Sequence, residues 1–290
     1  MTDICCIGHL TVDNIITPGH VATLNGGTAF YFTRGISRLK GISYKLITSV
    51  ADDQKEAIDD MRDDDIDIKV IPSEKTVVFE NIYGENMDNR QQRVLAEGEP
   101  FTVEKLQDVE ARFIHLGSLL SKDFSLDVIK YLSTRGTLSV DAQGFLRKVE
   151  GKEVEPCDWK EKRKALPYID ILKVNEHEID SLTGFKDARQ AAVQLAIWGV
   201  KEVLITLGSY GSMIYAGGNF YEIPAYEPDE LVDATGCGDT YAAGYLYMRS
   251  RGADYEECGR FAAAMATLKL ENSGPFNGDE DDIRKIMDED

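Results

Sequence analysis

Short apolar runs of strand length alternate with helix-length segments along most of this 290-residue chain. This alternation leaves few folds open, because strands joined by crossover helices form a parallel sheet with helices on both faces. We therefore predict an α/β fold built on a central, mostly parallel sheet. In such sheets ligands bind beyond the carboxyl ends of the strands, so polar residues that directly follow a strand are the first candidates for a site.

The pattern places each element approximately. Strands are predicted at residues 3–8, 10–16, 44–50, 66–71, 112–117, 137–141, 169–174 and 202–206, with a hairpin at 212–215 and 220–223. Helices are predicted at residues 28–39, 53–61, 123–133, 175–182, 188–198, 238–250 and 254–270. Residues 145–165 are charged and expected to be partly helical, and the acidic tail at 279–290 favours a solvated face over a docked helix. Without an internal repeat or a low-complexity linker, residues 1–290 are expected to form one domain.

Residues 72–98 interrupt the alternation. Aromatic and β-branched residues at 76–83 and 91–96 flank a polar turn at 84–89, which is the pattern of an antiparallel hairpin. A hairpin inside an otherwise strand–helix chain indicates a separate small sheet, which with residues 10–24 would form a lid over the main sheet. An ordinary hairpin at the sheet edge is the alternative that this pattern leaves open.

Charge and composition exclude several classes of protein. A net charge of −19 offers no basic stripe to neutralise phosphates, which argues against nucleic-acid binding and against an anionic membrane surface. The five cysteines form no disulfide framework, which favours a reduced compartment. The sequence has no basic segment followed by an apolar run and no apolar stretch approaching about 20 residues. We therefore expect neither a signal peptide nor a membrane span. The expectation is a soluble cytoplasmic protein.

The most informative local motif is the run Gly-Cys-Gly-Asp at residues 236–239, which opens a helical pattern. Gly236 and Gly238 lack Cβ atoms, so the backbone can turn tightly and approach a ligand closely. The first amides of a helix are unpaired and carry partial positive charge, which makes this turn a candidate anion site. Asp239 is either an ordinary first-turn acid or a functional carboxylate, and the helix N-terminus is expected to keep it ionised and only weakly basic.

Residues 233–239, Asp-Ala-Thr-Gly-Cys-Gly-Asp, resemble the C-terminal signature of the ribokinase-like (PfkB) family of sugar and nucleoside kinases. The resemblance implies a ribokinase-like three-layer sandwich with a small β-sheet lid. It also implies ATP as the phosphoryl donor and Asp239 as the catalytic base. In the same way, the backbone amides of Gly236, Cys237 and Gly238 would form the anion hole.

Two further segments match the family and lie directly after predicted strands. Asn175 and Glu178 match its Asn-x-x-Glu motif, which implies water-mediated Mg²⁺ near the triphosphate; a helix-capping pair is the alternative, and both can hold together. The segment at 206–211 matches the Thr-x-Gly-x-x-Gly pattern beside the nucleotide phosphates. The resemblance therefore implies ATP contacts from Asn175, Thr206, Gly208, Gly211 and Thr235.

The resemblance also implies an acceptor site near the N-terminus. Asp13 and the pair Gly26-Gly27 would face the acceptor's hydroxyls, and charged acceptors make strong hydrogen bonds. Tyr31 stands where the family often has Asn, which indicates a different or bulkier acceptor. Asn89, Arg90 and Arg93 fall in the predicted lid turn, from which they could contact the acceptor's polar groups. A surface position is the alternative for Asp13, and a solvated turn for the two arginines. Asp233, with residues 272–274, would bind a monovalent cation such as K⁺.

The sequence thus predicts an ATP- and Mg²⁺-dependent kinase of a small sugar or polyol, and a homodimer formed through the lid is compatible with it. A nucleoside kinase, with Phe30, Tyr31 or Phe32 stacking on the base, is the nearest alternative. A catalytically silent nucleotide- or sugar-binding protein is the third. The patterns GxGxxG and GxxxxGK do not occur, which disfavours an NAD-dependent dehydrogenase and a P-loop enzyme.

Overall fold

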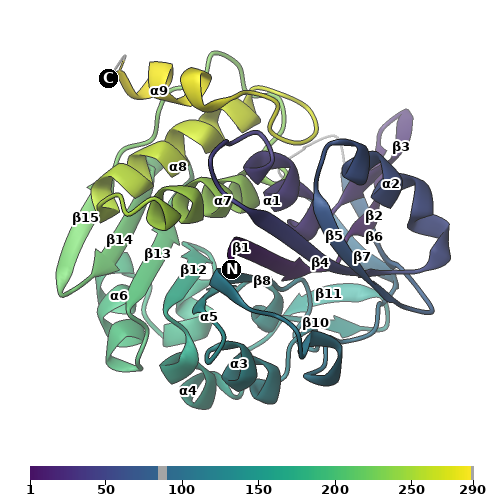
Figure 1. Cartoon of the computed structure of the whole chain (residues 1–290), viewed down its shortest axis with the longest axis horizontal. Coiled ribbons are helices and arrows are strands. Elements are labelled where there is room, and N and C mark those ends of the chain that lie inside the picture. Colours follow the sequence, from purple (N-terminus) through teal and green to yellow (C-terminus); the bar gives the residue numbers. More distant parts are fainter. Residues whose placement is uncertain (84–89, 289–290) are drawn as a thin grey trace.

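The computed structural model describes residues 1–83 and 90–288, and its main feature is a nine-stranded sheet (Figure 1). The strand order is β15-β14-β13-β12-β9-β8-β1-β4-β5, and neighbours are parallel except for β14, which runs antiparallel to both β13 and β15. The strands are β1 (Thr2–Gly8), β4 (Tyr44–Val50), β5 (Asp67–Pro72), β8 (Ala111–Gly117), β9 (Thr137–Asp141), β12 (Ile171–Asn175), β13 (Glu202–Thr206), β14 (Ser212–Ala216) and β15 (Asn219–Ile223). The predicted mostly parallel α/β sheet is confirmed.

Helices cover both faces of this sheet, which gives three layers (Figure 1). One face packs against α1 (Thr28–Ile36), α2 (Lys55–Asp63), α7 (Cys237–Ser250) and α8 (Tyr255–Leu270), with α9 (Glu280–Asp288) docked beyond them. The other face packs against α3 (Leu126–Leu132), α4 (Lys162–Ala165), α5 (Ile179–Thr183) and α6 (Ala188–Ile197). Because both faces are buried, the central strands are almost continuously apolar, which is why they were recognisable in the sequence. No helix of the described ranges is both long and apolar enough to cross a membrane.

Small residues set the position of α7, which carries the glycine motif at its N-terminus. Gly244 faces α8 so closely that a Cβ atom there would lie 3.1 Å from the Cα atom of Ala262 and 3.1 Å from the Met265 sulfur. Ala242 and Ala243 are buried beside it. This close packing fixes α7 between α1 and α8 and so fixes where the helix points its free amides.

A second, six-stranded sheet has the order β10-β11-β7-β6-β2-β3. Its strands are β2 (Thr11–Thr17), β3 (His20–Gly26), β6 (Val77–Tyr83), β7 (Arg90–Ala96), β10 (Arg147–Glu150) and β11 (Glu153–Pro156). Only the β2–β6 pair is parallel. The predicted separate small sheet is therefore confirmed, and the predicted polar turn at residues 84–89, with Asn89, lies outside the described residues.

Several element assignments from the sequence were wrong. Residues 145–165 are partly helical as expected, in α4, but the β10–β11 hairpin at 147–156 was missed; β11 pairs with β7 of the second sheet. The tail forms α9, with Ile283 fully buried, instead of a solvated face. The third helix begins at Leu126 because Ser125 caps it, and α5 begins only at Ile179.

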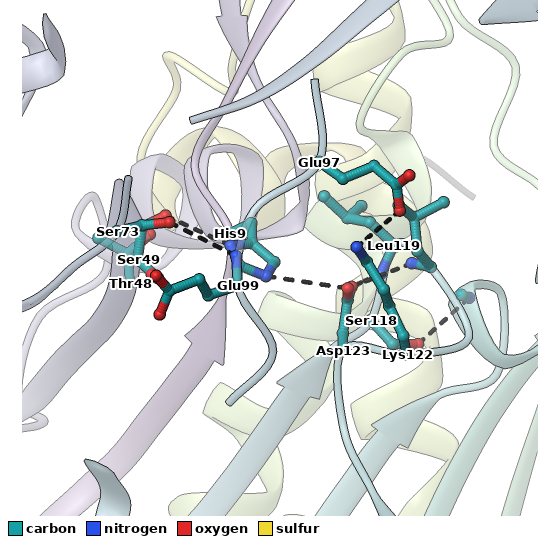
Figure 2. A network of polar contacts seen from close by, with 12 residues as sticks. His9, Thr48, Ser49, Ser73, Glu97, Glu99, Ser118, Leu119, Lys122 and Asp123 are labelled. Carbon is teal, nitrogen blue, oxygen red and sulfur yellow. Dashed lines mark hydrogen bonds and ion pairs between the residues drawn. The ribbon is translucent and has the colours of Figure 1, made fainter. Parts of the chain in front are cut away.

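A polar network ties the second sheet to the main sheet (Figure 2). His9, between β1 and β2, donates from its Nδ1 atom to the Ser49 carbonyl oxygen at 3.3 Å, and its Nε2 atom lies 3.8 Å from the Asp123 carboxylate. Asp123 in turn accepts hydrogen bonds from the amides of Leu119 and Leu120 at 2.8 and 3.0 Å. His9 lies on the connection from β1 to β2, whereas Ser49 belongs to β4 and Asp123 to the connection from β8 to α3, so the network attaches the start of the second sheet to the main sheet.

The docking of α9 can be tested by its buried side chain. We expect Ile283→Ala to lower the free energy of unfolding by about 2–3 kcal/mol, because it removes buried methyl groups and leaves a cavity. Lys285→Ala, at an exposed position of the same helix, is the control and should change stability by less than about 0.5 kcal/mol. Urea unfolding of both variants measures the difference, and equal stabilities would contradict the docked position of α9.

Candidate active site

The N-terminus of α7 forms the centre of the site. Gly236 caps the helix in the left-handed region, with φ of 78°, and a Cβ atom there would lie 2.2 Å from the Tyr31 ring. Both the conformation and the lack of space therefore require glycine. Within the described residues no protein acceptor takes the amides of Gly238 and Asp239, whereas the Cys237 amide donates to the Ala234 carbonyl at 3.2 Å. The Gly236 amide also has no protein acceptor in the described part of the chain, so the donors free for an anion are those of residues 236, 238 and 239, and Cys237, expected to contribute its amide, does not.

Asp239 lies in an environment that makes it a better base than expected from the sequence. Burial, followed by the nearby Asp141 carboxylate, raises the pKa of its carboxyl to about 6. Lys173 and a hydrogen bond from Thr28 act in the opposite direction. Asp239 is therefore a stronger base than an ordinary aspartate, because burial and a like charge raise its pKa, although it remains largely ionised at neutral pH as expected.

An ion pair that the sequence analysis missed stands beside Asp239. Lys173 on β12 donates to Asp141 at the end of β9 at 2.8 Å, and both side chains are buried. Although burial opposes both shifts, the pair lowers the pKa of Asp141 and raises that of Lys173, so both are charged at neutral pH. The signal was present in the sequence, since a lysine at the centre of the apolar run 169–174 requires a buried partner.

A polar cavity of about 210 Å³ opens next to Asp239, between the two sheets. The main sheet and α7 contribute Asp141, Lys173 and Asp239 to its wall. The second sheet covers it with residues of β2, β6 and β7, so that the cavity is lined by Thr11, Asp13, Gly27, Thr28, Tyr31, Phe79, Asn81, Gln92, Leu119, Gln143, Arg147, Ala234, Thr235, Gly236 and Gly238 besides these three. Such a wall of charged and amide groups suits a ligand with many hydroxyl groups.

Of the N-terminal motif, Asp13 and Gly27 line this cavity, whereas Gly26, expected to face the acceptor as well, does not. Asp13 accepts a hydrogen bond of 2.7 Å from the Thr11 hydroxyl and lines the cavity. Gly26 lies behind it, where a Cβ atom would be 2.4 Å from the Asp13 carboxylate. Gly27, with φ of 83°, leaves room for the His9 carbonyl and starts α1. The two glycines therefore hold the Asp13 carboxylate at the cavity wall.

The second sheet presents different side chains from those expected. Arg93 does not line the cavity but pairs with Glu153 at 2.7 Å and with Glu80 at 3.6 Å. Because side chains alternate along a strand, its neighbour Gln92 faces the cavity instead and donates to Asn81 at 2.9 Å. Arg90, the other predicted arginine, begins β7.

A second cavity, of about 740 Å³, lies on the other side of the glycine motif. Asn175, Thr206, Gly208 and Gly211 line it as the resemblance implied, together with Cys237 and Gly238 of the motif. Apolar side chains from the loop before α7 and from α8 form the rest of its wall, among them Ala225, Leu231, Ala263, Ala266 and Leu270. Thr235, predicted to contact the same ligand, lines the 210 Å³ cavity instead.

Asn175 and Glu178 make the reciprocal hydrogen bonds of the capping pair that was the alternative to a metal site, but these bonds close the turn before α5, which begins at Ile179 without a side-chain cap. The Asn175 side chain accepts from the amides of His177 and Glu178 at 2.9 and 3.1 Å, and Glu178 accepts from the Asn175 amide at 3.0 Å. Burial, followed by the Asp141 carboxylate, raises the pKa of Glu178. A nearby cation would relieve this desolvated negative charge, so the capping role is compatible with a role near a metal ion.

A third cavity, of about 530 Å³, adjoins the polar one and shares Asp13, Tyr31, Ala234 and Thr235 with it. Of the three aromatic residues considered for stacking, Tyr31 lines both cavities. Phe32 is fully buried against His115 in the core, and Phe30 lines neither cavity. Stacking on Phe30 or Phe32 is thus not supported, because their rings face the protein.

The sequence of this chain is similar to those of known kinases. The sequence pattern of the pfkB family carbohydrate kinases matches residues 1–282. A cytidine kinase of Thermococcus kodakarensis is 30% identical, over 96% of this chain and 99% of its own length.

Solved structures of kinases have the same fold. A pyrophosphate-dependent myo-inositol-1 kinase, converted by two substitutions into a myo-inositol-3 kinase, superposes with a TM-score of 0.87, 29% identity and 99% coverage of both chains. Arabidopsis thaliana ribokinase complexed with ribose and ATP superposes with a TM-score of 0.78 and 21% identity, covering 99% of this chain and 98% of its own, a likeness of fold alone.

The raised pKa of Asp239 predicts a pH-dependent effect on stability. The folded pKa of about 6 lies above the ordinary value near 3.9, so the folded state binds the proton more tightly and loses stability as the pH rises from about 4 to above 6. We expect Asp239→Asn to stabilise the protein at pH 8 by about 2–3 kcal/mol, and not at pH 4. Thermal unfolding at both pH values measures this; Asp229→Asn, at an exposed position, should show no such difference.

Proposed function

This chain belongs to the pfkB family of carbohydrate kinases, and from that premise we propose that it transfers the γ-phosphoryl group of ATP to a hydroxyl group of a small sugar or polyol. The observation that carries the proposal is the position of Gly238, which lines both the 740 Å³ cavity and the 210 Å³ cavity. A donor in the larger cavity and an acceptor in the smaller one would meet at this residue. Asp239, next in sequence, lines the acceptor side.

Asp239 is the group that would receive the proton of the attacking hydroxyl. A loose phosphoryl-transfer transition state requires positioning and charge stabilisation more than a strong base. A carboxylate with a pKa of about 6 is largely ionised at neutral pH, yet it accepts a proton more readily than an ordinary aspartate does. The acceptor oxygen then forms its bond to the γ-phosphorus as the bond from this phosphorus to the β–γ bridging oxygen breaks, and ADP leaves.

The free amides of Gly238 and Asp239 would bind the transferred phosphoryl group, where they can be worth roughly 3–4 kcal/mol each by analogy with oxyanion holes. Lys173 stands beside them, since a Cβ atom at Gly238 would lie 3.0 Å from its ammonium nitrogen. Its positive charge would offset the negative charge that Asp141, Asp239 and the phosphates bring together.

Magnesium is the metal that this chemistry implies; Asn175 lines the larger cavity, whereas Glu178 is not among its lining residues and could act only at a distance. Glu178, whose pKa is raised by burial, and Asn175 would hold the ion through water molecules. When bound, Mg²⁺ neutralises charge on the phosphates. The protein residues position the ion and the two substrates around it.

The shape of the larger cavity supports a nucleotide donor. Its volume of about 740 Å³ lies in the range of pockets that bind cofactor-sized ligands, roughly 300–1,000 Å³. The alanine and leucine side chains in its wall offer an apolar surface for an adenine ring. Pyrophosphate, the donor of the inositol kinase to which this chain is similar, is small and fully charged, and it would leave this apolar part unfilled.

The smaller cavity supports a hydroxyl-rich acceptor, and the adjoining 530 Å³ cavity supports a second candidate. A nucleoside could place its ribose beside Asp239 and its base in the adjoining cavity, next to Tyr31. The similarity to a cytidine kinase points in the same direction. A sugar or polyol remains our first proposal because the groups closest to Asp239 are polar and charged. Movement of the second sheet over either acceptor would exclude water and so limit hydrolysis of ATP.

The role of Asp239 gives the first functional prediction. We expect Asp239→Asn to lower kcat by about 10²–10⁴-fold with little change in nucleotide affinity, because only the proton acceptor is lost. Steady-state kinetics and calorimetric titration of ATP separate the two effects. Asp229→Asn is the matched control and should keep wild-type turnover. Unchanged kcat in the Asp239 variant would contradict the proposed mechanism.

Donor and acceptor are identified by one matrix of assays. Sugars, polyols including inositols, and nucleosides are each tested with ATP and with pyrophosphate, with and without Mg²⁺, and the phosphorylated product is measured directly. We expect a sugar or polyol with ATP and Mg²⁺ to give the highest kcat/KM. A nucleoside with higher kcat/KM would replace the first acceptor by the second, and pyrophosphate exceeding ATP would overturn the proposed donor.

A further inference from the structure

A lysine ammonium group is buried at the base of the loop that leads into α7. Lys269, near the end of α8, has no exposed surface. Its Nζ atom lies 2.7 Å from the Asp233 carbonyl oxygen, 3.1 Å from the Asn272 carbonyl oxygen and 3.3 Å from the Asp233 carboxylate. An ammonium group has three N–H donors, so each has an oxygen partner. Burial of a charge is costly unless it is paired in this way, so the position calls for a reason.

The loop held by Lys269 is the one that positions the anion site. The amides of Val232 and Asp233 donate to the Leu270 carbonyl at 3.0 and 3.1 Å, and the Asp233 carboxylate accepts from the Thr235 amide at 2.9 Å. Gly236 follows directly as the cap of α7. The ammonium group therefore connects the end of α8 to the turn from which the free amides of residues 238 and 239 project.

The same oxygens were the ones expected to bind a monovalent cation. Carbonyl and carboxylate oxygens are suitable ligands for such an ion, and the sequence resemblance placed it at Asp233 with residues 272–274. In this protein the Asp233 and Asn272 carbonyls and one Asp233 carboxylate oxygen already contact Lys269. A second positive charge there would lie beside a fixed ammonium and would lack these ligands, so the residues do not fit a monovalent cation.

We propose that the Lys269 ammonium replaces a bound monovalent cation and is the positioning residue for the anion site, so that turnover does not depend on K⁺. This proposal rests on the proposed kinase function. A helix-terminal lysine that only binds the last carbonyls of α8 is the simpler explanation. The two explanations make different predictions. If the ammonium group replaces a cation, a small cation should restore the turnover that is lost when the ammonium group is removed; if Lys269 only binds helix carbonyls, it should not.

The test uses Lys269→Ala, which leaves space for a cation at the three oxygens, and Lys269→Met, which fills that space without charge. For the wild-type protein we expect equal turnover in Na⁺ and K⁺ buffers. For Lys269→Ala we expect kcat in Na⁺ buffer to fall by on the order of 100-fold with a smaller change in KM, because the amides are displaced. Ammonium, methylammonium or K⁺ should restore kcat at least about tenfold in Lys269→Ala and not in Lys269→Met.

A second measurement needs neither substrate nor turnover, so it separates this proposal from the proposed function. Thermal unfolding in Li⁺, Na⁺, K⁺ and NH₄⁺ at equal ionic strength should give one Tm for the wild-type protein. For Lys269→Ala, Tm should rise selectively in NH₄⁺ or K⁺. A K⁺-specific rise in Tm or turnover of the wild-type protein would overturn the proposal whether or not the variants fold. Loss of activity in Lys269→Ala that no cation restores would overturn it as well.

Discussion

The site depends on the interactions among three charged side chains, Asp141, Lys173 and Asp239, that line one cavity at the carboxyl edge of the main sheet. Asp141 and Asp239 repel each other, and Lys173 contacts the first at 2.8 Å and offsets the charge of both. The result is asymmetric: Lys173 keeps the pKa of Asp141 low, and burial leaves that of Asp239 raised to about 6. One carboxylate is thereby fixed as the partner of an ammonium, and the other is left able to exchange a proton.

The glycine motif at the start of α7 also depends on contacts from the rest of the fold. The helix N-terminus supplies free amides, but its direction is set by the close packing of Gly244 against α8 and by the Lys269 contacts at the base of the loop. Tyr31, packed on Gly236, connects α1 to the same turn. The free amides at the start of α7 are therefore positioned by contacts from α8, the next helix, and from α1, which lies far away in the sequence.

The sequence predicted the sheet and most helices because strands buried on both faces are continuously apolar, and it predicted the glycine motif because no other residue fits Gly236. It did not predict contacts whose two partners are distant in the sequence. The β10–β11 hairpin could not be recognised because its charged residues are stabilised by pairing with β7, and Arg93 was assigned to the wrong face of its strand for want of register. The roles of Lys173 and Lys269 could not be predicted, because their oxygen partners, on Asp141 and Asp233, are separated from them by more than 30 residues.

The chain passes between the two sheets at several points: β1 to β2, β3 to α1, β5 to β6, β7 to β8, β9 to β10 and β11 to α4. The second sheet is joined to the main sheet by all these connections and by the His9–Asp123 network, so it cannot rotate about a single hinge. It can only move by bending as a whole. Molecules would then enter through a slot along the rim. Discrimination by size would act on the rate of entry as well as on the fit of the bound molecule, and bulky competitors would be rejected before they reach the reacting groups.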